Sequence, residues 1–192
     1  LGQVNGAIIG SRWVSGRWVG KMALAFKSSS DRVRFRSYQA AESMTIAMWV
    51  RVDQIDAEPG ARHSLLHSDG QDPGDLQIHL DHRGKLHMEL IGRDIELTSR
   101  WRADPALLGR WVHLVWVLDG RNKQVRSYVN GRLDSRQTNV SFGTVGLNGP
   151  AQLGNWDQQH RNLQGLVDEL LIAGRPMSRQ EIADLYEAGN PY

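Results

Sequence analysis

The chain has 192 residues, and its 23 lysines and arginines nearly balance 21 aspartates and glutamates, for a formal net charge of +2. It contains no cysteine, which excludes disulfides, thiolate metal sites and a cysteine nucleophile. Its basic residues form no stripe, and no apolar run approaches the roughly 20 residues of a membrane-spanning helix. We therefore predict no nucleic-acid partner and no membrane insertion of this segment.

Residues 1–20 show no regular period of apolar residues, and we expect them to form an irregular segment that packs on the rest of the domain. The first predicted strand is Met22–Phe26. In the next one, Arg32–Arg36, charged and apolar residues alternate strictly. This alternation is typical of a half-buried strand with Val33 and Phe35 pointing inward.

The clearest strand signal lies in the segment Met44–Val52, where every second residue is apolar. A helix would scatter these side chains around its circumference, whereas a strand places all of them on one face. Shorter strand patterns follow along the chain at Ser64–His67, Leu76–Leu80, Lys85–Ile91, Ile95–Thr98, Trp111–Leu118, Val125–Val129, Ala151–Gly154 and Leu166–Ile172.

Two connections between these segments have the chemistry of tight hairpins. The turn at residues 81–84 ends in Gly84, and Asn130-Gly131 favours a type I′ turn, which needs positive φ at both positions. One helix is predicted near the end of the chain, because Ser178 and Glu181 form a capping box and Gly189 can end the helix.

Many short strands at regular spacing and a single terminal helix indicate an all-β fold. We predict a β-sandwich of two packed antiparallel sheets with one short C-terminal helix, in a single domain that spans residues 1–192. The alternating strands and helices of a doubly wound α/β fold are missing from the pattern.

Four groups of residues, in chain order, resemble the motifs of laminin-G-like, concanavalin A-like jelly-roll domains. Met44–Val50 is similar to the family's FTISAWV strand, and Trp111–Val115 with Tyr128–Gly131 is similar to its WHHVA and LYVNG segments. The other two groups are Met22–Phe26 with Asp31–Val33, and Leu163–Leu170 leading into Pro176–Ser178 and Glu181-Ile182. One departure is the stretch Lys27–Ser30, which replaces the usual glycine.

The resemblance implies a non-catalytic binding module for a carbohydrate or an extracellular protein. It implies a place in a larger extracellular, cell-surface or periplasmic protein, with other domains and any signal or anchor outside this segment. The alternatives are a spacer domain of a membrane-anchored sensor or surface protein and, less favoured, a polysaccharide lyase or glycoside hydrolase. We predict no enzyme, because the sequence lacks a strand with paired carboxylates and a nucleophile elbow.

Calcium is the one cofactor that the resemblance suggests, because family members often bind it near loop carboxylates. The family fold would bring the first strands near the last, so Asp31 and Asp168 are the candidate ligands. Asp168 shares a strand face with Leu166 and Leu170, and a buried carboxylate needs a partner. That partner is either a metal ion or, as we favour, hydrogen bonds from the backbone or an arginine.

Two predicted neighbouring strands carry a set of polar residues on the face opposite their apolar one. If the turn at 81–84 sets the register, His79 lies opposite His87 and Gln77 lies opposite Glu89. The two histidines and Glu89 could ligate zinc with an open position. Alternatively, the four residues could form a polar floor for a sugar or simply face solvent. We name them as candidate ligand-binding residues.

A loop tryptophan is the best candidate for stacking on a sugar ring. Trp156, followed by Asp157, comes after a predicted strand in a polar loop, and we predict that this pair contacts the ligand, with edge packing of Trp156 as the alternative. Trp49, Trp111 and Trp116 lie in predicted strands and are expected in the core.

Overall fold

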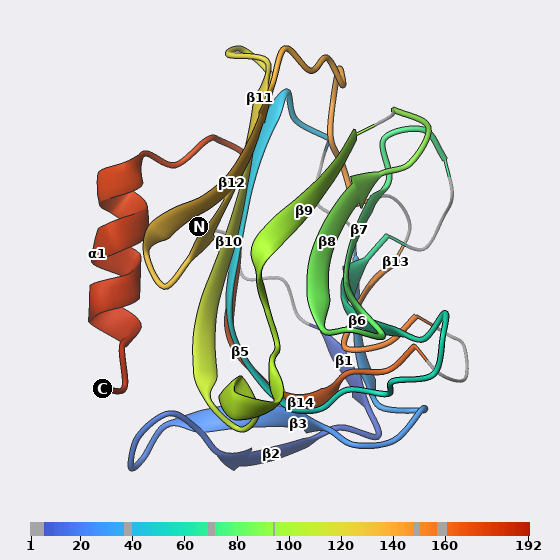
Figure 1. Cartoon of the computed structure of the whole chain (residues 1–192), viewed down its shortest axis with the longest axis vertical. Helices are drawn as coiled ribbons and strands as arrows, with labels where there is room; N and C mark the ends of the chain where they lie inside the picture. Colours follow the sequence, from blue (N-terminus) through green and yellow to red (C-terminus); the bar gives the residue numbers. More distant parts are fainter. Residues whose placement is uncertain (1–5, 37–39, 69–71, 94, 148–149, 157–160) are drawn as a thin grey trace.

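The computed structural model describes residues 6–36, 40–68, 72–93, 95–147, 150–156 and 161–192. Within this part of the chain, two antiparallel sheets of seven strands each face one another (Figure 1). Sheet A has the strand order β1 (Ala7–Ile9), β4 (Arg32–Arg36), β13 (Pro150–Leu153), β6 (Arg62–His67), β7 (Leu76–Asp81), β8 (Lys85–Leu90) and β9 (Ile95–Arg102). Sheet B has the order β12 (Arg132–Thr138), β11 (Gln124–Val129), β10 (Trp111–Asp119), β5 (Ser43–Gln54), β14 (Gln164–Ala173), β3 (Met22–Phe26) and β2 (Arg12–Ser15).

The main hydrophobic core lies between the two sheets and follows the predicted period of two. All five alternate residues of β5 from Met44 to Val52 belong to it, as do Leu76, Ile78 and Leu80 of β7. Burying each such side chain contributes about 1.5–3 kcal/mol relative to leaving it exposed. The prediction of a two-layer antiparallel sandwich is therefore confirmed.

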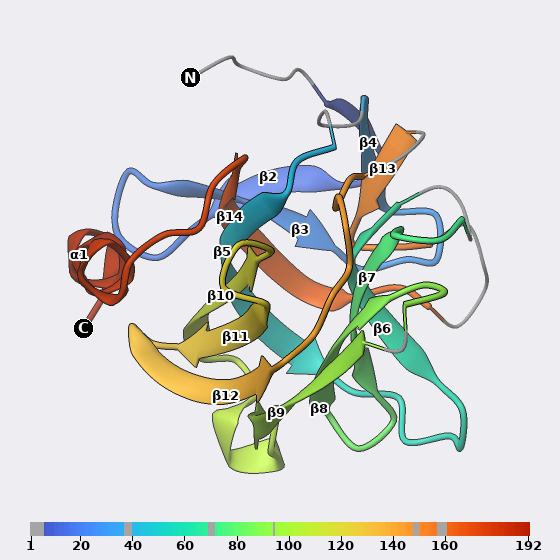
Figure 2. The ribbon, with the colours of Figure 1, turned by 90° about the horizontal axis from the view of Figure 1, so that it is seen from above.

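Helix α1 (Arg179–Gly189) covers the other face of sheet B, away from sheet A (Figure 2). Ile182 of the helix and Met177 just before it form a second apolar cluster with Val115 and Val117 of β10. Strand β10 is therefore buried on both faces, which explains why its residues are apolar on both faces apart from His113 and the terminal Asp119. The predicted capping box is present, since Ser178 Oγ accepts from the Glu181 N–H and the Glu181 carboxylate accepts from the Ser178 N–H.

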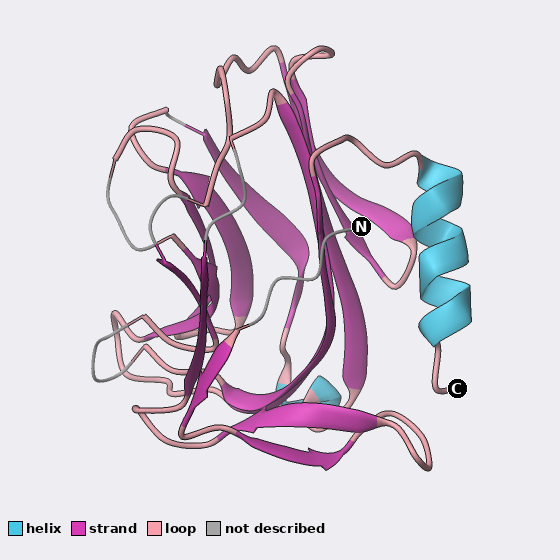
Figure 3. Ribbon diagram, turned by 180° about the vertical axis from the view of Figure 1, so that it is seen from behind, coloured by secondary structure: helices cyan, strands magenta, loops and turns pink. Residues whose placement is uncertain are grey.

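The expectation of an irregular segment over residues 1–20 is wrong for two stretches. β1 pairs with β4 and β2 pairs with β3, so each adds a strand at the edge of one sheet, as the ribbon seen from behind shows (Figure 3). Strand β12 at the other edge of sheet B was also not predicted. Edge strands escape pattern analysis because they pair on one side and bury little: six of the seven β12 side chains carry hydrogen-bonding groups, and none is fully buried.

The hairpin turns agree with the sequence chemistry. Asn130 and Gly131 both have positive φ, at 49° and 74°, and Gly84 has a φ of 74°. The second of these turns joins β7 to β8 and fixes their register, on which the polar face of sheet A depends. Among the described residues, no helix is long and apolar enough to cross a membrane.

Candidate functional site

The face of sheet A that points away from the core carries two rows of polar residues across neighbouring strands. The predicted register is confirmed, with His79 opposite His87 and Gln77 opposite Glu89. β6 and β9 extend both rows, because Ser64 and Thr98 flank the histidine pair, while His67 lies opposite Gln77. The rows arise because alternate side chains of a strand point to opposite faces of the sheet. The Leu, Ile and Met residues of β7 and β8 point into the core, so the polar residues between them point to the outer face.

Four aromatic rings form a continuous line over this face. Trp156 stacks on His67 with ring centroids 5.3 Å apart and an angle of 8° between the planes. His67 lies 6.4 Å from His79, and His79 stacks on His87 at 5.3 Å and 13°. We call Trp156, His67, His79 and His87 the ring row. At its Trp156 end, the guanidinium carbon of Arg161 lies 4.5 Å from the indole centroid.

The ring row is more buried than an ordinary sheet surface. His67 and His79 are only 1% and 2% exposed, and Gln77 is 4% exposed. The interpretation as plain solvent-facing strand positions is therefore wrong for His79 and Gln77, whereas His87 and Glu89 are partly exposed. The connection from β13 to β14 lies beside β6, with the Gly154 N–H donating to Leu65 O and the Ser64 N–H donating to Arg161 O. That connection brings Trp156 onto His67.

The two inner imidazoles are neutral at physiological pH. Burial disfavours the charged imidazolium and lowers the pKa of His67 to about 3, with a further contribution from the nearby Arg161 and Arg62 guanidinium groups. Burial, with Arg62, also lowers the pKa of His79 to about 3. Within the described part of the chain, both ring nitrogens of His67 and Nδ1 of His79 make no hydrogen bond. The row thus presents buried polar atoms with unused hydrogen-bonding capacity, which in a folded protein call for a partner.

Charged residues border the row at its β8 end. Nδ1 of His87 lies 2.9 Å from the Glu96 carboxylate and its Nε2 lies 3.4 Å from Asp81. An oxygen of Glu89 lies 3.7 Å from both Arg62 and Nε2 of His79. His87 and Glu89 keep partly exposed side chains, so this end of the row is open to a ligand.

The geometry does not favour zinc at these histidines. The rings of His79 and His87 are stacked face to face, so their nitrogen lone pairs, which lie in the ring planes, do not converge on one point. No group of three or more histidines, aspartates and glutamates placed to hold a metal ion occurs among the described residues.

The two candidate calcium ligands belong to separate hydrogen-bonded groups. Asp31 closes the turn between β3 and β4 by accepting from the backbone N–H groups of Lys27 and Ser28, at 2.8 and 3.0 Å, and from the Ser28 hydroxyl at 2.8 Å. Asp168 accepts from Nε of Arg17 at 3.0 Å, with Nζ of Lys21 at 3.7 Å. As arranged, these carboxylates do not fit a shared calcium ion, because binding would replace protein donors that already neutralise them.

Sequence reasoning missed Arg17, which holds the N-terminal hairpin against the rest of sheet B. Its side chain is fully buried and pairs with Asp168 and with Glu169, 2.5 Å away, and its guanidinium also donates to the Gly189 carbonyl at the end of α1. The guanidinium carbon lies 4.6 Å from the rings of both Trp18 and Trp49. The arginine-tryptophan repeat at residues 12–20 was the signal that could have indicated this role.

The remaining predicted site residues are placed as follows. Trp156 is half-buried and packs on His67 and beneath Arg161, so it combines edge packing with a place in the ring row. Asp157 lies outside the described residues. The prediction that Trp49, Trp111 and Trp116 are core residues is confirmed, since they are 2%, 8% and 1% exposed.

The two packed antiparallel sheets define a jelly-roll domain with the concanavalin A-like fold. The sequence profile of the concanavalin A-like lectin/glucanases superfamily matches residues 27–183. The chain belongs to this family. No curated protein sequence matches the chain.

Several solved structures share the fold. The binding domain of Paraclostridial Mosquitocidal Protein 1 superposes with a TM-score of 0.72 and 16% identity, over 97% of this chain and 48% of that one. The binding domain of botulinum neurotoxin serotype D gives 0.74 and 16%, over 96% and 46%. A SAP-like pentraxin from Limulus polyphemus gives 0.62 and 12%, over 84% and 80%. The chain therefore spans about half the length of the toxin binding domains.

Proposed function

We propose that this chain is a non-catalytic glycan-binding module whose ligand lies along the ring row on the outer face of sheet A. The observation that carries the proposal is the line of four rings from Trp156 to His87, stacked in its two outer pairs, with nitrogens of His67 and His79 that make no hydrogen bond within the described part of the chain. Solved structures with the same fold include binding domains of toxins, which supports a binding role.

The chemistry of the row suits a sugar better than an apolar ligand. The C–H faces of a pyranose pack on aromatic rings, and its hydroxyl groups both donate and accept hydrogen bonds. The partly exposed Glu89 and His87 offer an acceptor and a ring nitrogen at the β8 end of the row, and the neutral imidazoles of His67 and His79 behind them can donate or accept where a hydroxyl reaches them. A buried polar atom that gains a partner on binding recovers the free energy that its desolvation cost.

The carboxylates beside the row support binding rather than hydrolysis. Burial by itself would raise the pKa of Asp81, but hydrogen bonds from the backbone N–H groups of Lys85 and Arg83 and from His87 lower it overall. A glycosidase needs a carboxylic acid whose pKa is raised so that it can protonate the leaving group. Asp81 has the opposite property. We also propose an extracellular, cell-surface or periplasmic location, in keeping with the lectin-type family.

A glycan array followed by calorimetry tests the proposal. We expect Trp156→Ala and His87→Ala to weaken binding at least tenfold, since each loses about 1.5 kcal/mol of stacking or hydrogen bonding. Matched controls are Trp13→Ala, at a 58% exposed position of edge strand β2, and His82→Ala, whose side chain accepts a hydrogen bond from the neighbouring Arg83. Both should bind as the unchanged protein does.

Two results would count against this function. If no glycan binds, a spacer role is favoured. If a glycan binds and all four variants retain its affinity, the module binds sugar elsewhere and the ring row has only a structural role. Turnover of any polysaccharide would overturn the non-catalytic assignment.

A further inference from the structure

A cavity that shares no residue with the ring row lies where strand β10 extends beyond its pairing with β11. β10 begins at Trp111, but its pairing with β11 begins only at Leu114 opposite Val129. The Asn130 side chain caps the gap in part, because its oxygen accepts from the His113 N–H at 2.9 Å. Next along the strand, the Trp111 N–H has no ladder partner on this side and reaches only the Tyr192 hydroxyl, at 3.4 Å.

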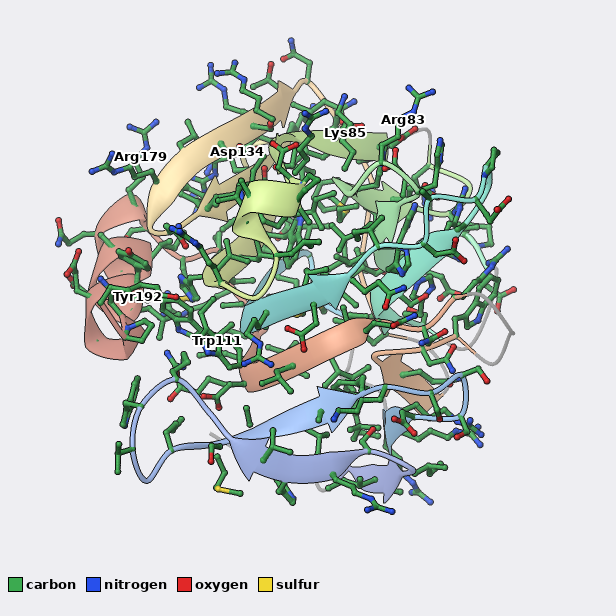
Figure 4. The ribbon with its side chains drawn as sticks, turned by 60° about the horizontal axis from the view of Figure 1, so that its bottom comes forward. Arg83, Lys85, Trp111, Asp134, Arg179 and Tyr192 are labelled. Atoms are coloured by element: carbon green, nitrogen blue, oxygen red, sulfur yellow. The ribbon has the colours of Figure 1, made fainter. Side chains whose placement is uncertain are left out.

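The notch left by this mismatch has a volume of about 270 Å³. Residues from several elements line it: Trp101 of β9, Leu107 of the 3₁₀ turn Pro105–Leu107, the start of β10, the turn after β11, and Tyr192. Figure 4 shows Trp111 and Tyr192 side by side, in keeping with the contact between the Trp111 N–H and the Tyr192 hydroxyl. The volume lies just under the roughly 300 Å³ at which drug-sized sites begin, so the notch suits one sugar ring.

The lining is rich in hydrogen-bond donors and carries one cation. Arg110 is exposed and forms no ion pair or side-chain hydrogen bond with any described residue. The Asn130 oxygen is used, so its NH₂ group faces outward with no partner among the described residues, and the Tyr192 hydroxyl can donate its proton. No carboxylate side chain is among the lining residues.

From this combination we infer a site for a uronate, a pyranose ring that carries one carboxylate. The walls formed by Trp101, Leu107 and Val112 are apolar and accept the C–H face of the ring. The fork of Arg110 matches a carboxylate, with which guanidinium groups form paired, charge-assisted hydrogen bonds. Asn130 and Tyr192 are then in place to hydrogen-bond the ring hydroxyls. The assignment is independent of the proposed function, because it shares no residue with the ring row.

The test is a titration with sodium glucuronate, followed through the indole N–H resonances of Trp101 and Trp111 in ¹⁵N-labelled protein. We expect saturable shifts with glucuronate and none with glucose, which has the same ring without the carboxylate. Comparison of the free monosaccharide with a glucuronate-terminated disaccharide then shows whether the site takes free sugar or a chain end.

Two variants test whether binding depends on the positive charge of the notch. Arg110→Gln removes the cation from an exposed position, and Asn130→Asp keeps both the turn and the oxygen that caps His113 while adding a negative charge. Each should weaken glucuronate binding at least tenfold, whereas Arg121→Gln, an exposed arginine just beyond the Asp119 end of β10, should not. Trp156→Ala should also leave this binding unchanged, which separates the two sites. Absence of any shift with glucuronate, equal shifts with glucose, or full affinity in Arg110→Gln would overturn the inference.

Discussion

The buried arginine offers the sharpest test of how the fold is held together. Arg17→Met removes the guanidinium and keeps much of the apolar stem. Asp168, which is 8% exposed, then keeps only Lys21 as a nearby cation, at 3.7 Å and with a side chain 27% exposed. The N-terminal hairpin also loses its hydrogen bond to the carbonyl of Gly189 at the end of α1.

The expected cost can be worked out from these contacts. Removing one partner of a buried ion pair typically costs about 3–5 kcal/mol, because the other charge stays desolvated and unpaired. Because Lys21 still lies near Asp168, it offsets part of this cost, and we take the lower end of the range, about 3 kcal/mol. Loss of the cation–π contacts with Trp18 and Trp49 costs about 1 kcal/mol, and sulfur–aromatic contacts of the new methionine recover a similar amount. We therefore expect the free energy of unfolding to fall by about 3 kcal/mol.

Urea unfolding at neutral pH, followed by tryptophan fluorescence, measures this change. The matched control is Arg51→Met, because Arg51 also pairs with an aspartate, Asp53, at 2.8 Å but on the surface; its cost should stay below about 1 kcal/mol. In the double variant Arg17→Met/Asp168→Leu no charge is left unpaired, and most of the lost stability should return. The reasoning would be refuted if Arg17→Met lowered the free energy of unfolding by less than about 1 kcal/mol, or if the double variant were less stable than either single variant.

Three further expectations follow. The folded-state pKa values of His67 and His79 are about 3, below the ordinary 6.5, so below pH 6.5 only the unfolded chain takes up protons at these residues. The free energy of unfolding should therefore fall with decreasing pH by up to about 1.4 kcal/mol per pH unit for each histidine. Urea unfolding between pH 7.5 and about 5 measures this slope, which should be shallower in His79→Gln. Asp134 of β12 (Figure 4) connects the two sheets, because it accepts hydrogen bonds from the Ser99 hydroxyl at 2.7 Å and from two backbone N–H groups of β9. Asp134→Ala should therefore lower the free energy of unfolding by about 2 kcal/mol. An unchanged urea midpoint would count against this connection. Because Asp31 and Asp168 already have protein donors, neither a chelator nor added Ca²⁺ should move the melting temperature, whereas a rise with Ca²⁺ would show binding to the folded state.

The sequence alone was sufficient for the parts of the fold that depend on local rules. Alternation of apolar residues fixed the inner face of β5, the Asn130-Gly131 pair fixed a hairpin turn, and Ser178 with Glu181 fixed the start of the helix. The same rules gave the register that sets His79 opposite His87, because a tight turn and a period of two leave one alignment that keeps the apolar face inward.

Only the tertiary structure decided what lies against those faces. A period of two shows which side chains leave the core, but it does not show whether solvent or another segment meets them. The approach of the β13–β14 connection to β6 buries His67 and His79 and completes the ring row. Likewise, the pairing of Arg17 with Asp168 joins the two ends of the chain. Such contacts form between segments far apart in sequence, where no local propensity acts, so they exist only once the two sheets have packed.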